Sequence, residues 1–374
     1  MVEKIRVLHI IYDLSVAGAQ TVVMNILRGM KDDDKYEVRL IVRNAPNGSK
    51  NDADVVAEKL PVVYCNYKPY TAIPIIRTVI NWFRCQRLFY KEIKKYNPDI
   101  IHTHLTDILP FTVIPEKLSN AKYFVHTLHS DPYAIEDRFV RWAKYAFNKL
   151  HFYPICVTES QVAKAQERYG ITDCSVVHNG IDIDRYSVDE SRDSIRKEVG
   201  VPEDTFVIGF VGRLSQIKNL GFLLKIFNEY QKGNEKAFLM IVGDGDQKGY
   251  CEQLIDEYGI KGKVVFAGQR ADVERMYKAM DVFMLTSFYE SNSIVTVEAQ
   301  CAGVRCVVAD SIPSSVVVSD LVNRISLGAP AGVWIDAIDD RVPHDRITGD
   351  LMKYSIQNGI NELREVYEKH CKGI

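Results

Sequence analysis

Short apolar runs rich in β-branched residues alternate with amphipathic segments along almost the whole chain. In the first half, runs of strand type occupy residues 5–11, 36–42, 99–104, 122–129, 154–158 and 174–178. In the second half they occupy residues 206–212, 237–243, 263–268, 281–286 and 305–309. Segments with helical spacing lie between them, the clearest at residues 19–30, 75–96, 219–233, 247–258, 271–279 and 294–303. Nearly continuous apolar strands joined by helices predict an α/β protein whose parallel sheets are covered on both faces.

The two series of strands predict two doubly wound domains. The 374 residues are too many for one ordinary core and comfortable for two. We place the first domain at residues 1–180 and the second at residues 195–350, joined through the polar stretch 179–205. Open α/β sheets bind ligands beyond the carboxyl ends of their strands. Two such sheets facing one another would therefore frame a cleft between the domains.

Charge divides unevenly between the two halves of the chain. The formal net charge is −2, which disfavours a nucleic-acid partner held by overall positive charge. Residues 1–180 contain 24 Lys and Arg against 19 Asp and Glu, and subtraction from the totals of 47 and 49 leaves 23 against 30 in residues 181–374. A basic half and an acidic half favour two domains with different partners, and random scatter of surface charge is the competing interpretation.

Cysteine use and hydropathy indicate a protein of the reducing cytoplasm. No two of the eight cysteines have a CxxC spacing, so neither a zinc site nor a thioredoxin-like pair is predicted. The apolar run near the N-terminus is too short for a signal peptide, and no stretch of about 18 apolar residues offers a membrane span. We therefore expect a soluble, cytoplasmic protein.

Two loops after predicted strands have residues suited to phosphate. After the first strand, small residues that include Gly18 and Ala19 open a helix whose N-terminus offers free N–H groups. After the first strand of the second half, Arg213 and Lys218 flank a short loop before Asn219, which can begin the next helix. Two cations beside a helix N-terminus suit a diphosphate. Taken alone, each feature is as typical of an ordinary strand-to-helix turn or of surface charge.

Two carboxylates surround a helix start after the predicted strand 281–286. Glu290 lies in the loop, and Glu298 lies in the helix that follows. A carboxylate in the loop can accept hydrogen bonds from sugar hydroxyls, and one in the helix can bridge the two hydroxyls of a ribose. The amides of Ile294 and Val295 would point at phosphate. Two glutamates at this spacing also arise by chance, so their placement around the helix start is the informative part.

Histidines gather at two predicted strands of the first half. His126 and His129 lie at a strand end, where an imidazole can hydrogen-bond or act as an acid or base. A structural role is at least as good an interpretation of each histidine alone. His102 and His104 have the spacing of metal ligands on a strand, but the sequence offers no third ligand, so we interpret them as structural.

Taken together, these segments resemble a known family. The motifs GRLSQIKN, IVGDGD, VVFAGQRADV, EAQCAGVRCVVAD and HNGID, with the Glu290 and Glu298 element, are similar in kind and order to those of family 4 glycosyltransferases, retaining enzymes of bacterial polysaccharide synthesis. The resemblance covers nearly the whole chain. It implies the GT-B fold, in which two Rossmann-like domains face each other and the second holds the nucleotide-sugar donor. It also implies that residues 351–374 form a helix that crosses back onto the first domain.

The resemblance implies a role for each matching residue. Arg213 and Lys218 match the pair that binds the diphosphate, and His129 matches the histidine near the anomeric carbon. Glu298 matches the carboxylate that binds ribose, and Glu290 the one that reaches the transferred sugar. Further donor contacts are implied for Gly18, Ala19, Gly212, Asn292, Ser293, Ile294 and Val295.

The resemblance also implies a reaction that needs no metal and no other cofactor. Asp244 and Asp246 form a DxD-like pattern, but in the family this turn is structural. Nothing in the sequence singles out a carboxylate nucleophile of the kind that glycosidases use. Transfer with retention would then occur on one face of the sugar, with a donor phosphate oxygen helping to deprotonate the acceptor. Arg213, Lys218 and helix N-terminal amides would stabilise the departing diphosphate.

The donor loop departs from the family pattern. Ser291, Asn292 and Ser293 replace a glycine-rich stretch, so side chains stand where backbone approaches the sugar. Ala17 also replaces a common glycine, and Arg305 a common proline. These changes put the identity of the donor sugar in doubt and admit a degenerate module that binds nucleotide sugar without turnover.

Two further activities bear on the choice of function. A nucleotide-sugar epimerase of GT-B fold stays open as an alternative, because it needs no separate acceptor. An NAD-dependent dehydrogenase is disfavoured, because no predicted strand is followed by GxGxxG with an acidic residue about twenty positions further on.

The first domain contains two segments that mix aromatic and basic residues. Residues 73–96 and 138–149 combine Trp, Phe and Tyr with several Arg and Lys, a pattern suited to peripheral contact with an anionic bilayer. A core-packed helix with a solvated basic face gives the same pattern. With the basic balance of the first half, it favours a saccharide acceptor linked to a membrane lipid.

Overall fold

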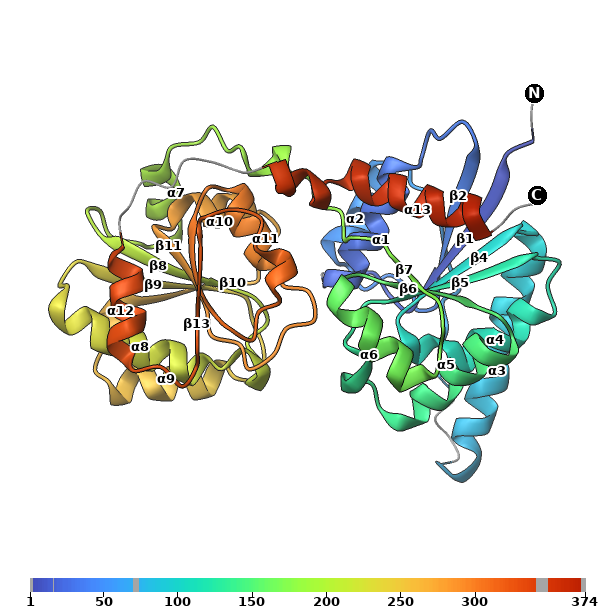
Figure 1. The fold of residues 1–374 in the computed structure, drawn as a ribbon, viewed down its shortest axis with the longest axis horizontal. Coiled ribbons are helices and arrows are strands. Elements are labelled where there is room, and N and C mark those ends of the chain that lie inside the picture. The colour runs from blue at the N-terminus through green and yellow to red at the C-terminus, as the bar shows by residue number, and fades with distance from the viewer. Residues whose placement is uncertain (1–2, 16, 70–73, 341–348, 371–374) are drawn as a thin grey trace. The chain divides into compact units, whose positions relative to one another are not determined.

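The computed structural model describes residues 3–15, 17–69, 74–340 and 349–370, which form two compact units (Figure 1). Unit 1 contains Met1–Ile181 and Ser355–Ile374, and unit 2 contains Asp182–Tyr354. The sequence placed the second domain at 195–350, so the structure adds an earlier segment to unit 2. Arg185 in that segment pairs with Glu274 at 2.6 Å, which ties it to the second unit.

Unit 1 is built on a seven-stranded sheet in which each neighbouring pair of strands is parallel. The spatial order is β3-β2-β1-β4-β5-β6-β7. The strands are β1 (Ile5–Ile11), β2 (Tyr36–Val42), β3 (Val62–Tyr64), β4 (Ile100–His104), β5 (Tyr123–Leu128), β6 (Tyr153–Cys156) and β7 (Ser175–Val176). The order reverses between β1 and β4, the position where open α/β sheets form ligand crevices.

Helices cover both faces of this sheet (Figure 1). They are α1 (Gly18–Gly29), α2 (Lys50–Ala57), α3 (Pro74–Tyr96), α4 (Leu109–Lys117), α5 (Asp137–Lys149), α6 (Glu159–Tyr169) and α13 (Ile356–His370). One apolar cluster joins the sheet to α3, α4, α5 and α6 and includes Phe89 and Phe147. The cluster on the opposite face joins the sheet to α1 and α13 and includes Leu27 and Leu363.

Helix α13 belongs to unit 1 although it ends the chain. The hydroxyl of Tyr367 lies 2.8 Å from Nδ1 of His102, and Arg364 forms an ion pair with Asp33. The resemblance implied a helix over residues 351–374. The structure begins it at Ile356, because the preceding residues form the short helix η7 (Gly349–Tyr354), and residues 371–374 lie outside the described part of the chain.

Unit 2 repeats the plan with a six-stranded parallel sheet of order β10-β9-β8-β11-β12-β13. Its strands are β8 (Phe206–Val211), β9 (Ala237–Val242), β10 (Val264–Gly268), β11 (Val282–Leu285), β12 (Arg305–Ala309) and β13 (Val322–Ile325). Its helices are α7 (Arg192–Val199), α8 (Leu220–Gly233), α9 (Lys248–Glu257), α10 (Val273–Ala279), α11 (Ile294–Cys301) and α12 (Ala331–Asp339). The α/β class and the two parallel sheets expected from the sequence are therefore confirmed.

Two short strands of the structure were not predicted from the sequence. The strands β3 and β13 contain three and four residues, and both are outermost in their sheets. Three or four residues are too few to establish a periodicity from the sequence alone.

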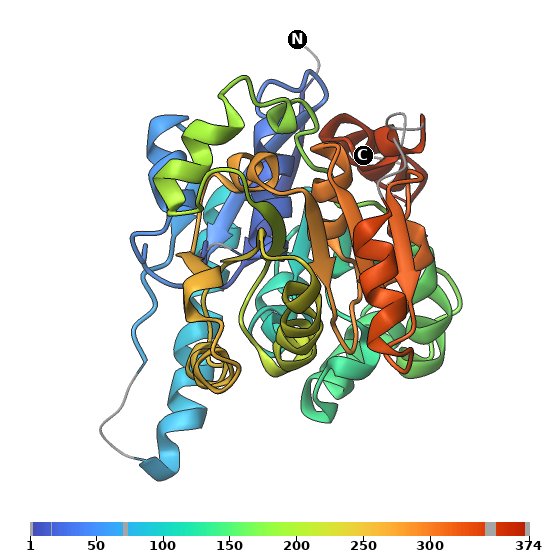
Figure 2. The same cartoon turned by 90° about the vertical axis from the view of Figure 1, so that its left-hand side faces the viewer.

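Helix α3 is the longest described helix and has two different faces. Figures 1 and 2 show its first turns reaching beyond α4 and α5, whose ends lie closer to the sheet. Farther along, Cys85, Phe89 and Ile93 are buried in the core. Its other face leaves Val79 and Phe83 exposed by 57% and 61%. None of the described helices is long and apolar enough to cross a membrane.

Glu116 of α4 predicts a pH dependence of stability. Its side chain is fully buried, and interaction with the hydroxyl of Thr112 offsets only part of the cost of ionising it. Burial raises the pKa of Glu116 from 4.5 to about 8. The folded protein therefore holds a proton that the unfolded chain releases above pH 4.5, so stability falls as the pH rises from 4.5 to 8.

We expect Glu116→Gln to remove this dependence, since an amide stays neutral throughout. Urea unfolding at pH 5 and pH 8 should show the variant gaining a few kcal/mol relative to wild type at the higher pH. The matched control is Glu365→Gln, which changes an exposed glutamate of α13 and should leave the pH dependence intact. Parallel curves for wild type and Glu116→Gln would contradict the assignment.

Candidate functional site

The loops after three neighbouring strands of unit 2 carry most of the predicted donor-site residues. Strands β9, β8 and β11 lie side by side and run in parallel, so their carboxyl ends share one edge of the sheet. Gly212, Arg213 and Lys218 follow β8, and Glu290 follows β11. The tertiary fold thus brings together residues that are more than 70 positions apart in the sequence.

The turn after β9 fixes the loop that carries Arg213. The N–H of Leu214 donates to the carbonyl of Asp244 at 3.0 Å, and the N–H of Gln247 donates to the carbonyl of Leu214 at 2.9 Å. A Cβ added to Gly245 would lie 2.2 Å from the carbonyl oxygen of Leu214, so only glycine allows this approach. Asp244 is exposed and accepts a hydrogen bond from the N–H of Gly245. The geometry assigns the DxD-like turn a structural task.

Lys218 and Glu290 form a partly buried ion pair that links the β8 and β11 loops. Nζ of Lys218 lies 2.5 Å from Oε1 of Glu290, and the side chains are only 16% and 11% exposed. The hydroxyl of Ser287 donates to the same carboxylate oxygen at 2.7 Å. Arg213 is exposed, and the described part of the chain supplies no ion-pair partner for it. One predicted cation is therefore held in place and the other is available to a ligand.

Glu298 lies on α11 and is oriented by a tyrosine. The hydroxyl of Tyr277 donates to Oε2 of Glu298 at 3.0 Å and also lies 3.0 Å from the carbonyl oxygen of Val295. Burial raises the pKa of Glu298, and hydrogen bonds from Tyr186 and Tyr277 oppose the rise. No local sequence signal pointed to Tyr277, because it precedes Glu298 by 21 positions on another helix.

The start of α11 differs in one respect from the sequence expectation. The amides of Ile294 and Val295 were expected to point at phosphate, but the N–H of Ile294 donates to the carbonyl of Asn292 at 2.9 Å. Ser293 is buried and its hydroxyl bonds to Thr296 at 2.9 Å. The N–H of Ile294 and the hydroxyl of Ser293 therefore form hydrogen bonds within the protein, although both residues were predicted from the sequence to contact the donor.

Asn292 has a buried side-chain amide that no described residue contacts by a hydrogen bond. Its amide nitrogen and amide oxygen are both buried, and neither has a hydrogen-bond partner within the described residues. A buried amide in this state loses the free energy of its hydrogen bonds with water. Asn292 therefore has unused capacity to bind a polar ligand group.

The remaining predicted residues lie in unit 1. Gly18 and Ala19 form the start of α1, where Gly18 is exposed and a Cβ added to it would meet nothing within 4 Å. His129 follows β5, and its Nε2 lies 3.0 Å from Nδ1 of His104. Burial lowers the pKa of His129 to about 4, so its imidazole is neutral near pH 7. His126 does not join these histidines, because its side chain forms a hydrogen bond with Thr103 on the other face of the sheet.

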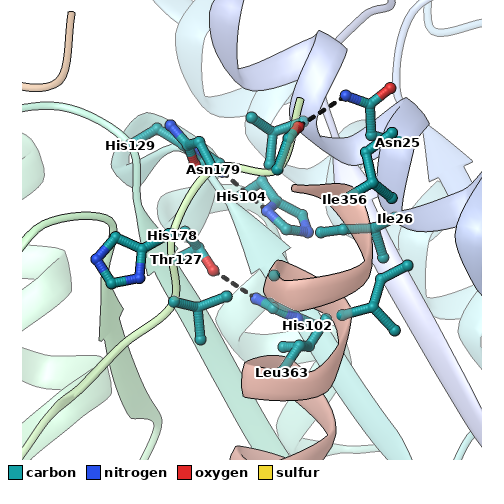
Figure 3. Close-up of a pocket in the computed structure, with 15 residues that line it drawn as sticks. Asn25, Ile26, His102, His104, Thr127, His129, His178, Asn179, Ile356 and Leu363 are labelled. Atoms are coloured by element: carbon teal, nitrogen blue, oxygen red, sulfur yellow. Dashed lines mark hydrogen bonds between the residues drawn. The ribbon is translucent and has the colours of Figure 1, made fainter. Parts of the chain in front are cut away.

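A small cavity of unit 1 lies beside His129 (Figure 3). Its sheet side includes His102, His104 and Thr127, and α1 and α13 form the opposite side with residues such as Asn25 and Ile356. The cavity of about 20 Å³ has room for one water molecule. His9 of β1 also lies against these histidines: one ring nitrogen of each of His9, His102 and His104 falls within 4.8 Å of the others. The sequence could not show this grouping, because β1 and β4 are far apart along the chain.

Two family models match the chain in succession. Residues 16–185 match the model described as Glycosyltransferase Family 4, and residues 191–346 match the model described as Glycosyl transferases group 1. Together these matches run through most of both units.

Relatives and solved structures agree with these models. EpsF of Bacillus subtilis (strain 168), named as a glycosyltransferase, is 26% identical over 97% of this chain and 96% of its own length. UDP-Gal:alpha-D-GlcNAc-diphosphoundecaprenol alpha-1,3-galactosyltransferase of Escherichia coli is 23% identical over 97% of this chain and 95% of its own length. The structure of HepE from Anabaena, solved in complex with UDP and glucose, superposes with a TM-score of 0.80, 18% identity and coverage of 98% and 100% of the two chains. The chain belongs to the family 4 glycosyltransferases and has the GT-B fold.

Proposed function

We propose that the chain transfers a hexose-type sugar, with retention, from a nucleotide diphosphate donor to a saccharide acceptor. The observation that carries the proposal is the Lys218 and Glu290 pair, held beside the Arg213 loop at the carboxyl edge of the unit 2 sheet. The complex of HepE with UDP and glucose and the UDP-Gal donor in the name of the Escherichia coli relative support a uridine nucleotide as donor.

The two cations of this edge suit the departing diphosphate. An ammonium group has three N–H donors. Lys218 can therefore donate one hydrogen bond to Glu290 and a second to a phosphate oxygen. Arg213 adds a planar guanidinium that binds two phosphate oxygens at once. Their combined charge stabilises the leaving group in the way that a divalent ion does in other transferases, so we propose that the reaction requires no bound metal or other cofactor.

Glu290, Asn292 and Glu298 are proposed to hold the sugar and the ribose. Glu290 accepts from a hydroxyl of the transferred sugar, and Glu298, oriented by Tyr277, accepts from the ribose hydroxyls. The unpartnered amide of Asn292 supplies one donor group and one acceptor to the sugar. Since the family more often has glycine in this loop, Asn292 is our proposed determinant of donor-sugar choice.

His129 of unit 1 is proposed to act near the anomeric carbon as a neutral hydrogen-bonding group. Its lowered pKa excludes a permanent positive charge there near pH 7. The acceptor hydroxyl then passes its proton to an oxygen of the departing phosphate as the new glycosidic bond forms and the old one breaks. Both bonds lie on the same face of the sugar, which retains its configuration.

The acceptor is proposed to be linked to a membrane lipid, with unit 1 in peripheral contact with the bilayer. The exposed face of α3 places the apolar Val79 and Phe83 beside the exposed Arg84, Arg87 and Lys91. Apolar side chains next to a basic row are the pattern with which helices bind anionic lipid surfaces. The lipid diphosphate in the name of the Escherichia coli relative supports the same acceptor class.

The donor is tested by thermal unfolding with UDP-, GDP-, ADP- and TDP-sugars. We expect one nucleotide class to raise the midpoint, since ligand at about 100 times its dissociation constant adds about 2.7 kcal/mol to stability. Lys218→Ala should lose most of this shift and lower turnover by about 10²–10³-fold, the usual effect of removing a positioned donor group. Lys225→Ala, which changes an exposed lysine of α8, is the control and should behave as wild type.

The results that would contradict this proposal point to different conclusions. No shift with any nucleotide sugar, or turnover of Lys218→Ala within roughly threefold of wild type, would remove the diphosphate assignment. Donor binding with no product in the presence of saccharide acceptors would identify a binding module. Conversion of the donor sugar without an acceptor would identify an epimerase.

The membrane contact is tested by flotation with liposomes of anionic phospholipid. Wild type should float at low salt, and the pair Arg84→Glu and Arg87→Glu should bind at least roughly tenfold more weakly, because each basic residue near such a surface contributes about 1 kcal/mol. The matched control reverses two exposed lysines of unit 2, Lys236→Glu and Lys261→Glu. Equal loss in both double variants, or no flotation of wild type, would remove the membrane contact.

A further inference from the structure

Three histidines of unit 1 are joined end to end. Nδ1 of His9 lies 2.8 Å from Nε2 of His104, and Nδ1 of His104 lies 3.0 Å from Nε2 of His129. The planes of His9 and His104 differ by only 13°, and their centroids are 5.1 Å apart, as expected for rings joined through an in-plane N–H···N bond. The chain begins on β1, crosses β4 and ends at the loop after β5.

Both ends of this chain of rings are open. Nε2 of His9 and Nδ1 of His129 are buried nitrogens without a hydrogen-bond partner among the residues that the structure describes. His9 and His104 are completely buried, whereas His129 is only half-buried at the carboxyl edge of the sheet. The end at His129 therefore lies nearer the protein surface than the end at His9.

A metal ion is a weaker interpretation of the same cluster. A metal site here would use His9, His102 and His104. His102 already uses both ring nitrogens, one with the hydroxyl of Tyr367 at 2.8 Å and the other with the hydroxyl of Thr127 at 2.7 Å. The two remaining rings, His9 and His104, direct their nearest nitrogens at each other. Three ligands around one ion would have to break all of these contacts.

Burial keeps the three rings neutral. It lowers the pKa of His9 to about 3 and that of His129 to about 4, and it holds the pKa of His104 well below its ordinary value. A neutral imidazole has one N–H and one bare nitrogen, and each contact in the chain needs one of each. The three rings must therefore all carry the proton on Nε2 or all carry it on Nδ1.

We propose that His9 and His104 form a relay that sets the tautomer of His129. In the first state each ring is protonated on Nε2, and His129 presents a bare Nδ1 that accepts a hydrogen bond. In the second state each ring is protonated on Nδ1, and His129 presents an N–H that donates. The number of protons on the three rings is the same in both states, so His129 changes its hydrogen-bonding role without placing a charge in the core. Its use in sugar transfer rests on the proposed function, but the coupling of the three tautomers does not.

The tautomers are measured on the full chain labelled with ¹⁵N in histidine only. Long-range ¹H–¹⁵N correlation near pH 7 identifies the protonated nitrogen of each ring. We expect the same protonated nitrogen in His9, His104 and His129, and nitrogen–nitrogen couplings across both contacts. His104→Phe should change the ring ¹⁵N shifts of His129, and the control His126→Phe, at another fully buried histidine, should leave them unchanged.

Kinetics then tests whether His9 is a positioning residue. His9→Phe should lower kcat by roughly 10²-fold, the low end of the effect of losing one positioned hydrogen-bonding group, with little change in the KM of the donor. His9→Asn should recover most of this loss, because its amide can place a donor or an acceptor where Nδ1 of His9 lies. If His9 had only a structural role, the His9→Asn and His9→Phe variants would have the same kcat when their stabilities are equal.

The outcomes separate the relay from the proposed function. Opposite tautomers in His104 and His129, or unchanged shifts of His129 in His104→Phe, would overturn the relay whatever the enzyme transfers. Stoichiometric zinc in purified protein, lost in His9→Asn, would also overturn it in favour of a metal site. Coupled tautomers in a protein without transferase activity would uphold the relay and remove only its proposed use.

Discussion

Parallel pairing of neighbouring strands is the constraint on which the rest of this structure depends. In a parallel sheet the carboxyl ends of all strands meet at one edge, so loops from distant parts of the sequence become neighbours. In unit 2 this places the loops after β8, β9 and β11 together, and the Lys218 and Glu290 pair closes the contact. In unit 1 the same geometry aligns β1, β4 and β5, which carry the linked histidines.

The two units treat polar groups in opposite ways. Unit 2 holds a paired charge at the carboxyl edge of its sheet and leaves Arg213 exposed, which is the arrangement from which we proposed an anionic donor. Unit 1 buries uncharged imidazoles in a row and links them by hydrogen bonds to one another, because an isolated charge in that core would be very costly. The two environments match the charged donor and the neutral acceptor hydroxyl of the proposed reaction.

The IVGDGD turn supports the candidate site through its backbone and not through a side chain. Gly245 lets the turn lie against Leu214, which fixes the backbone on which Arg213 stands. Donor loops of this family commonly use glycine for close approach to the ligand, and here Asn292 stands in that place with an unpartnered amide. Asn292 and the turn at Gly245 are therefore separate features of the site: one has a free polar group, and the other supports the backbone.

The sequence by itself determined the class of fold, its two parallel sheets and the family. These follow from local features: alternation of apolar strands with helices, and motifs whose residues are near neighbours in the chain. Tertiary structure alone decided that Ile294 donates to Asn292, that Tyr277 orients Glu298, that α13 seats Tyr367 on His102, and that His9 completes a chain to His129. Each of these contacts depends on backbone conformation or on residues that only the packing of strands and helices brings together, and no periodicity in one sequence records such a meeting.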